Sequence, residues 1–383
     1  MTLVKFADIV HLSTSRTADP ASAGIDRFVG LEHIEPENLH IRSWGNVADG
    51  TTFNSIFKRG QVLFGKRRAY QCKVAVADFD GVCSSDIYVF ESKDPGKLLP
   101  EFLPFICQSE EFIEYAVKTS AGSLSPRTSW SHLANYKFYL PTLPEQLRMV
   151  EMLWAVEIYK QRLANLSDAT SRLLDSLRAE LVASDLKIGS QCIGDVADLV
   201  IDRHNVIKSE SYPISGVYSF GRGLLSRGNL TGVETQYKYL HRIHEGQLVL
   251  SKLKAWEGAV AVVESEYDLT YLSPEYPTFD LNRDRIIPEY MKLVCESPWF
   301  WRNIAVQSKG TAQRRVRIYP QDFLKVPIFV PSLQEQIEIV NRVNEVKNVL
   351  NLCNKGIDDT SNLKRVLLSK FLINKESSDR IES

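Results

Sequence analysis

The sequence predicts an α+β protein built as a tandem repeat, in which two globular α/β modules alternate with two long helices. Three observations predict this fold class. The chain has 383 residues, enough for two or three domains that each bury a core. The phrase PTLPEQLRMV at 141–150 recurs as PSLQEQIEIV at 331–340, an offset of 190 residues. A proline-free stretch with helical periodicity follows each copy.

The repeat extends on both sides of that phrase. FADIV at 6–10 matches VADLV at 196–200, again with an offset of 190. The same offset holds without a gap from Pro141 to Leu181. Between the match at 6–10 and Pro141 the similarity is looser, and the offset drifts to 186. We therefore interpret the chain as one module duplicated, with loops of different length. A period this long indicates tandem domains rather than a solenoid.

The first part of each period reads as strands and turns. Residues 1–141 alternate short β-branched or aromatic runs, such as QVLF and DIYVF, with Gly, Asp and Ser, and residues 186–331 repeat this pattern. A stretch led by proline predicts a helix inside each module, at 100–117 and at 288–306. We assign 1–141 and 186–331 to the two modules.

The second part of each period predicts a long helix, at 142–185 and at 332–374, and 375–383 is expected to be a flexible tail. Forty helical residues would extend about 60 Å, so each apolar stripe needs a partner, and the obvious partner is the other helix. A helical hairpin packed on its own module stays open as an alternative. Gly356 predicts a bend or interruption. The stripes are Leu163, Leu166, Thr170, Leu173, Leu177 and Leu181, and Cys353, Ile357, Thr360, Leu363, Leu367 and Phe371.

Composition limits the function classes. The net charge is -1, from 46 basic and 47 acidic residues, so any nucleic-acid binding requires cations that are concentrated locally or supplied by partner subunits. No run approaches the roughly 18 apolar residues of a membrane span, and the start MTLVKFADIV does not read as a signal peptide. We expect a cytoplasmic protein. The six cysteines form no C-x-x-C pair, and we expect neither disulfides nor a zinc site.

The phrase L-P-x-L-x-E-Q before a long helix, placed once after each of two variable modules, resembles the specificity (S) subunit of Type I restriction-modification systems. LFGKRRAYQCKVAVADFDGVCSSDIYVF at 63–90 also resembles the body of a target recognition domain of that family. The resemblance covers almost the whole chain. It implies that each module reads one half of a bipartite target in double-stranded DNA. It also implies that the helices pair as an antiparallel coiled coil with pseudo-twofold symmetry, and that they set the half-site spacing.

The resemblance further implies a chain without catalytic activity that binds no cofactor itself. S-adenosylmethionine, ATP and magnesium would be bound by partners: two modification (methyltransferase) subunits, docked on the helices, and a restriction (helicase-nuclease) subunit. Glutamate at the start of a helix complements the helix dipole. This effect alone would explain the two glutamates of the repeated phrase, and no partner subunit is needed for it. The leucines and glutamines beside them favour docking. The expected docking and spacer residues are Leu143, Glu145, Gln146, Leu163, Leu173 and Leu177, and Leu333, Glu335, Gln336, Leu363 and Leu367.

Cations mixed with aromatic and amide side chains mark the candidate DNA-binding loops, because arginine and lysine contact phosphates and forked donors read base edges. Any one of these cations could equally be a solvated surface residue, but their recurrence in both modules favours binding. In the first module the candidates are Arg42, Trp44, Lys66, Arg67, Arg68, Tyr70, Gln71, Ser123, Ser125 and Arg127. In the second they are Arg222, Arg227, Asn229, Lys252, Lys254, Trp256, Gln313, Arg314, Arg315 and Arg317.

The sequence contains neither the N/D-P-P-Y/F loop of DNA methyltransferases nor a G-x-x-x-x-G-K-S/T phosphate loop. Asp80, Glu91 and Lys93 follow the D…E-x-K order of metal-dependent nucleases, so a nuclease acting alone is one alternative function. A non-catalytic DNA-recognition scaffold of another defence assembly is a second. The histidines of HRIHE at 241–245 are interpreted as surface residues rather than metal ligands, and we expect no metal site.

Overall fold

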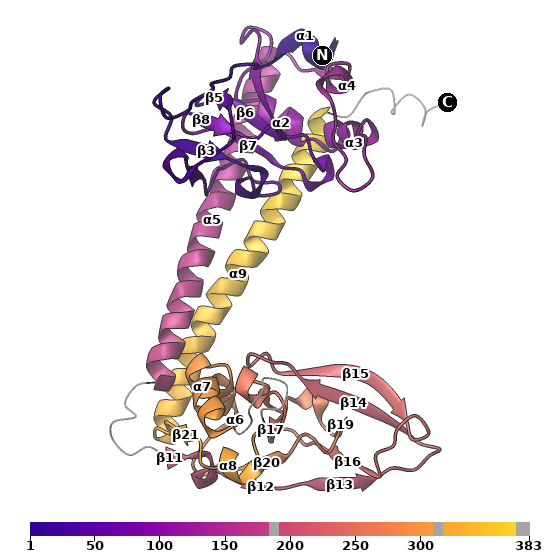
Figure 1. Ribbon diagram of the computed structural model, residues 1–383, viewed down its shortest axis with the longest axis vertical. Coiled ribbons are helices and arrows are strands. Elements are labelled where there is room, and N and C mark those ends of the chain that lie inside the picture. Colours follow the sequence, from indigo (N-terminus) through magenta and orange to yellow (C-terminus); the bar gives the residue numbers. More distant parts are fainter. Residues whose placement is uncertain (184–190, 309–316, 373–383) are drawn as a thin grey trace. The chain divides into compact units, whose positions relative to one another are not determined.

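The computed structural model describes residues 1–183, 191–308 and 317–372. The chain forms two compact units (Figure 1): unit 1 is Met1–Asn165 with the chain from Cys353 onward, and unit 2 is Leu166–Leu352. The boundaries between the units fall inside the two long helices, so each unit contains one module and one half of each helix.

Unit 1 contains a four-stranded antiparallel sheet in the order β2-β9-β6-β7, and a second sheet in the order β4-β3-β8-β5 in which only β3 and β8 run parallel. A two-stranded pair, β1-β10, precedes the long helix. Successive side chains of a strand face opposite sides, so these strands supply two cores: Phe64 of β6 lies in a core rich in phenylalanine, and the adjacent Leu63 lies in a second core. The strands are β1 Thr2–Lys5, β2 Val10–Leu12, β3 Arg27–Val29, β4 Gly45–Asn46, β5 Ser55–Phe57, β6 Val62–Gly65, β7 Val74–Val76, β8 Gly81–Cys83, β9 Ile87–Ser92 and β10 Lys137–Leu140.

The stretch predicted to be one helix at 100–117 forms two, α2 and α3. Ser109 separates them: its backbone is extended, and its Oγ accepts a hydrogen bond from the N–H of Phe112, which caps α3. Both helices bury their apolar faces on the four-stranded sheet, with Phe112 against Phe6 and Phe64. The helices of the module are α1 Phe6–Ile9, α2 Leu103–Gln108, α3 Glu110–Lys118 and α4 Trp130–Leu133, with 3-10 turns η1 Leu31–His33, η2 Val47–Asp49 and η3 Ala69–Gln71.

Unit 2 repeats the four-stranded antiparallel sheet in the order β12-β20-β17-β18. Its second sheet is larger, β13-β16-β19-β14-β15, and includes a long β14–β15 hairpin (Figure 1). The strands are β11 Gln191–Cys192, β12 Ala197–Leu199, β13 Asp202–Asn205, β14 Ser211–Val217, β15 Leu224–Thr231, β16 Tyr239–Arg242, β17 Leu248–Leu250, β18 Val260–Val262, β19 Tyr271–Leu272, β20 Thr278–Leu281 and β21 Pro327–Ile328. The helices are α6 Pro288–Cys295, α7 Pro298–Gln307 and α8 Pro320–Phe323, with 3-10 turns η4 Ile193–Asp195, η5 Ala255–Glu257 and η6 Ser265–Tyr267.

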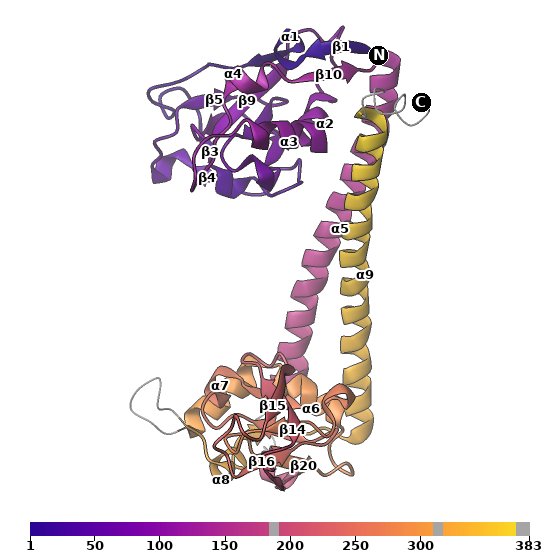
Figure 2. The ribbon, with the colours of Figure 1, turned by 90° about the vertical axis from the view of Figure 1, so that its right-hand side faces the viewer.

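The two long helices are α5, Leu143–Ala183, and α9, Leu333–Leu372, and they pack on each other as expected (Figure 2). The interruption expected at Gly356 is wrong, because α9 is continuous through this residue. A Cβ at position 356 would lie 2.9 Å from Cδ1 of Leu163, so glycine lets α5 approach α9 closely here. This contact offsets the low helix propensity of glycine.

The helix faces that meet differ from the predicted apolar stripes. Thr170, Cys353 and Thr360 are buried as expected, but Leu166, Leu173 and Leu363 are 49%, 51% and 50% exposed. Their neighbours face inward instead: Leu174 on α5, and Lys364 and Leu368 on α9. The seam buries an ion pair between Glu157 and Lys364. Hydrophobic periodicity does not identify buried polar positions such as these, so the predicted stripes do not coincide with the buried face of each helix.

Candidate nucleic-acid interface

Two of the basic candidates of unit 1, Arg67 and Arg127, meet at Asp86, which lies just before β9. Its carboxylate accepts a hydrogen bond from Nε of Arg127 at 2.7 Å and pairs with Nη1 of Arg67 at 3.5 Å. The Asp86 side chain is 16% exposed, whereas those of Arg67 and Arg127 are 38% and 49% exposed. The two guanidinium groups are therefore anchored at one side and open to solvent at the other.

The loop that carries Arg127 folds back onto the end of β6. Nη2 of Arg67 donates to Oγ of Ser125 at 2.9 Å, and the backbone N–H of Arg68 donates to the carbonyl of Pro126 at 2.8 Å. Arg68 has a left-handed backbone, with φ of 54°. We call Arg67, Arg68, Asp86, Ser125 and Arg127 the Asp86 cluster. The structure thus joins two predicted segments that lie about sixty residues apart in the sequence, and Asp86 is the member that sequence reasoning missed.

The electrostatics of the Asp86 cluster favour a bound anion. The hydrogen bond from Arg127 is the main reason why the pKa of Asp86 lies below its usual value, so the carboxylate stays charged. Lys66 lies half-buried nearby with Nζ 4.6 Å from the ring centre of Tyr88, and burial lowers its pKa while Asp86 opposes that shift. Arg16 and Arg127 add positive charge around the same lysine. Arg67 and Arg127 contact the Asp86 carboxylate and Lys66 lies within its electrostatic influence, so several cations gather near one carboxylate in a chain whose net charge is only -1.

The other candidates of unit 1 lie outside the Asp86 cluster. Nη2 of Arg42 donates to the side-chain oxygen of Asn165 on α5 at 3.0 Å, so this arginine is directed at the long helix. Trp44 packs against Phe79, and Arg27 lies 4.4 Å from the Trp44 ring centre. Tyr70 and Ser123 are exposed and Gln71 is half-buried.

In unit 2 a carboxylate again gathers two candidates. Glu275 pairs with Nζ of Lys252 at 3.9 Å and with Nη2 of Arg317 at 3.7 Å. Lys254 pairs with Glu257 at 2.9 Å and lies 5.4 Å from the ring centre of Trp256. The candidates Gln313, Arg314 and Arg315 lie outside the described residues.

The remaining candidates of unit 2 lie on the β14–β15 hairpin. Nε of Arg222 donates to the carbonyl of Ser219 at 3.0 Å, and the guanidinium stacks on the ring of Tyr218. Arg227 and Asn229 are exposed on β15. A hairpin of this kind can enter the major groove of DNA as a two-stranded ribbon.

The glutamines of the repeated phrase join each module to its long helix. Gln146 is fully buried: its Oε1 accepts from the N–H of Leu99 at 2.9 Å, and its Nε2 donates to the carbonyls of Lys97 at 2.8 Å and Pro141 at 2.9 Å. Gln336 makes the same three bonds at the same lengths, to Ile287, Arg285 and Pro331. This burial corrects the docking role expected for both glutamines, because they hold the helix to its own module.

The glutamates of the phrase cap their helices. Oε2 of Glu145 accepts from the backbone N–H and the hydroxyl of Thr142 at 2.8 and 2.9 Å, and Glu335 does the same with Ser332. The hydrogen bond from the backbone N–H of Thr142 is the main reason why the pKa of Glu145 lies below its usual value. The hydrogen bond from the Ser332 hydroxyl is the main reason why the pKa of Glu335 is lowered. Capping therefore accounts for both glutamates.

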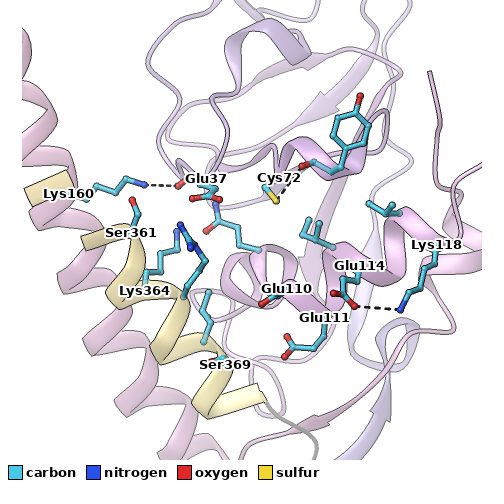
Figure 3. A pocket seen from close by; sticks show the side chains of 16 residues that line it. Glu37, Cys72, Glu110, Glu111, Glu114, Lys118, Lys160, Ser361, Lys364 and Ser369 are labelled. Carbon is cyan, nitrogen blue, oxygen red and sulfur yellow. Dashed lines mark hydrogen bonds and ion pairs between the residues drawn. The ribbon is translucent and has the colours of Figure 1, made fainter. Parts of the chain in front are cut away.

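A hollow of about 660 Å³ in unit 1 lies between α3 and the C-terminal half of α9 (Figure 3). Glu110, Glu111 and Glu114 line it from α3, and Lys160 donates there to the carbonyl of Glu37 at 3.2 Å. Lys118, Lys364 and Arg365 also line the hollow, so its lining combines acidic and basic side chains and has no excess of positive charge for a phosphate backbone.

Comparison with known proteins agrees with the resemblance in the sequence. Residues 14–166 match a family model described as the Type I restriction modification DNA specificity domain. The Type I restriction enzyme EcoDI specificity subunit of Escherichia coli is 32% identical over 169 residues, which cover 39% of this chain and 37% of that protein. The match thus spans well under half the length of this curated relative.

Two solved structures resemble the whole chain. One, described as the structural basis of complex assembly and conformational transition of the type I R-M system, is 19% identical, covers 97% of each chain and has a TM-score of 0.60. The Type I restriction-modification S subunit of M. genitalium is 13% identical, covers 97% of this chain and 96% of that one, and has a TM-score of 0.57. At these identities the likeness shows the fold.

Residues 14–166 are thus similar to a Type I restriction modification DNA specificity domain, and the whole chain shares the fold of a solved Type I restriction-modification S subunit.

The structure does not support the nuclease alternative. Glu91 accepts from Nε2 of Gln61 at 2.7 Å, the Asp80 carboxylate accepts from the N–H of Arg59 at 2.8 Å, and Lys93 bonds to the carbonyl of Ala7. Each of the three side chains thus has a separate partner. Within residues 1–183, 191–308 and 317–372, no group of three or more His, Cys, Asp or Glu side chains could hold a metal ion. No helix of these residues is long and apolar enough to cross a membrane.

Proposed function

We propose that this chain provides the DNA sequence specificity of a Type I restriction-modification complex and catalyses no reaction itself. Each module, 1–141 and 186–331, reads one half of a bipartite target in double-stranded DNA, and the helices set the distance between the halves. The observation that carries this proposal is the Asp86 cluster, together with its counterpart around Glu275. Both place cations on a carboxylate support in a chain whose net charge is only -1.

A carboxylate beside an arginine weakens non-specific attraction to phosphates, but it restricts the rotamers of the guanidinium. Fixed forked donors suit base edges, such as the O6 and N7 atoms of guanine, better than they suit the uniform phosphate backbone. The two clusters are therefore better suited to contacts with base edges than to non-specific binding of the phosphate backbone.

Replacement of both Arg67 and Arg68 by alanine should weaken DNA binding by about tenfold or more and reduce its salt dependence, because two cations near phosphates and bases are lost. Fluorescence anisotropy of the assembled complex at several salt concentrations measures both effects. Lys97 and Lys118, which pair with neighbours on the module surface, provide a charge-matched control double variant. An affinity and a salt slope like those of the wild type would remove the Asp86 cluster from the interface.

For docking, we propose the outer face of α5. Met152, Tyr159, Leu166 and Leu173 recur every seven residues on this continuous helix, and each is between 41% and 57% exposed. A heptad-spaced apolar stripe on a helix suits another helix as partner. We propose that two modification subunits dock there and that the restriction subunit joins through them. These partners would bind S-adenosylmethionine, ATP and magnesium, and the complex would act in the cytoplasm.

The function is tested by co-expression of the chain with a candidate modification subunit, followed by methylome sequencing. The proposal predicts methylation at one bipartite sequence, with two short specified halves and a fixed gap, and none without this chain. Changing Tyr159 and Leu166 to serine should abolish co-purification of the modification subunit without lowering the melting temperature, since both side chains are exposed. Methylation that is independent of the chain would contradict the proposal.

A further inference from the structure

The loop between α3 and α4 presents an apolar tip to solvent. Leu124 is 89% exposed, more than any other large hydrophobic side chain in the part of the chain that the structure describes. Scattered exposed leucines are ordinary on protein surfaces. This one is notable because of how firmly the loop holds it.

Several polar contacts hold the loop. Ala121 and Arg127 exchange two backbone hydrogen bonds, of 3.0 and 2.9 Å, which close the loop at its base. Gly122, with φ of 108°, permits the turn that follows. Nη2 of Arg68 lies 3.4 Å from the carbonyl oxygen of Leu124. The tip is therefore anchored through its backbone, and its side chain is directed away from the core.

The surroundings of the tip combine two chemistries. Arg67 and Arg127 are held on one carboxylate below it, and Ser123 and Ser125 flank it in the sequence. A leucine surrounded by arginines and hydroxyl groups matches a DNA groove, where cations meet phosphates at the walls and an apolar group meets base edges or the thymine methyl group at the floor. A purely apolar partner surface would cover the solvent-exposed sides of these arginines without offering them further acceptors.

We propose that residues 121–127 are the base-contacting finger of the first module, with Leu124 in contact with base edges in a DNA groove and Asp86 as the positioning residue that orients Arg67 and Arg127 beside it. This inference rests on the proposed function and goes beyond it, because it names the specificity-determining side chain and the group that positions its neighbours. Asp86 does not need to touch DNA.

The two roles predict opposite changes in binding. Leu124→Ser removes apolar contact but no charge, so affinity for the target should fall about tenfold while affinity for scrambled DNA and the salt slope stay unchanged. Asp86→Asn removes a negative charge and releases the arginines. Affinity for scrambled DNA should therefore rise, while the ratio of target affinity to scrambled affinity falls about tenfold. A merely structural Asp86 would not increase binding to scrambled DNA.

The test uses the full-length chain in its complex, with a duplex that carries the methylome-defined target and duplexes in which each half-site is scrambled in turn. Leu3→Ser, on the exposed side of β1, and Glu114→Gln, on the exposed face of α3, are the matched controls for apolar area and for charge. Melting temperatures check that all variants fold. The loss should be confined to one half-site.

Target-to-scrambled ratios like that of the wild type in both Leu124→Ser and Asp86→Asn would overturn the inference and leave the proposed function intact. Unchanged DNA discrimination in Leu124→Ser with loss of a co-purifying subunit would overturn it in favour of a protein contact. If the wild-type complex itself does not distinguish target from scrambled DNA, the proposed function fails first.

Discussion

Gln146 shows how much can depend on one buried amide. Replacement by alanine would leave the N–H of Leu99 and two carbonyls without their partner, and each buried group left unpaired costs about 1 to 3 kcal/mol. We expect Gln146→Ala to destabilise unit 1 by roughly 3 kcal/mol. Gln336→Ala should do the same to unit 2. Hydrogen exchange resolves the two units, and protection lost equally in both units by either variant would contradict this local role.

His241 predicts a pH dependence in unit 2. It is 3% exposed, its Nδ1 lies 2.7 Å from the carbonyl oxygen of Tyr276, and burial lowers its pKa, with Lys252 and Arg203 adding to the shift. The surface position expected for this histidine is thus wrong. Because the folded pKa lies below the unfolded value of about 6.5, the unfolded state takes up the proton first. Stability is full above pH 6.5 and falls as the pH decreases below it.

His241→Gln should remove this part of the pH dependence, because glutamine offers a donor that does not titrate. Thermal melts between pH 8 and pH 5.5 compare the two proteins, with His11→Gln as the control for an exposed histidine. Equal losses of melting temperature in the wild type and in His241→Gln would contradict the assignment.

At the scale of elements, the seam between α5 and α9 differs in its two halves. In unit 1 it buries the ion pair of Glu157 and Lys364. In unit 2 the repeat places Lys347 at the position of Glu157 and Leu174 at the position of Lys364. Lys347 pairs with Glu296 at 3.2 Å, and Leu174 is buried among apolar side chains. The same helix packing is therefore built once with an ion pair and once with a leucine.

That difference gives a prediction about the buried pair. Glu157→Leu alone should destabilise unit 1 by about 3 to 5 kcal/mol, because it leaves the Lys364 ammonium buried without a counter-charge. The double variant with Lys364→Leu should recover most of the loss, since unit 2 already uses leucine at that position. Denaturant unfolding of the three proteins measures this, and a double variant as unstable as the single one would contradict it.

The repeat in the sequence located both long helices correctly, whereas the apolar stripes did not identify the face that each helix buries. The offset of 190 located both long helices, because a duplicated phrase is independent of tertiary context. The stripe through Leu166, Leu173 and Leu363 missed the seam, because the seam buries Glu157, Lys364 and two threonines while these leucines remain on the outer surface. Asp86 could not be singled out either, since only the folded loop brings Arg127 to it.

For the molecule as a whole, we propose that each module reads one half-site and that the two long helices set the gap between the half-sites. Duplication of residues 159–165 within α5 and of 346–352 within α9 adds one heptad to each helix and keeps the phase of the seam. Seven helical residues add about 10.5 Å, which corresponds to roughly three base pairs of DNA at ~3.4 Å each.

Methylome sequencing of cells that carry this lengthened chain and its modification subunit measures that gap. We expect the same two half-sites, separated by a gap about three base pairs longer than that of the wild type. Methylation at the original spacing by the lengthened chain, or new half-sites at either spacing, would contradict the claim that the helices alone determine the distance.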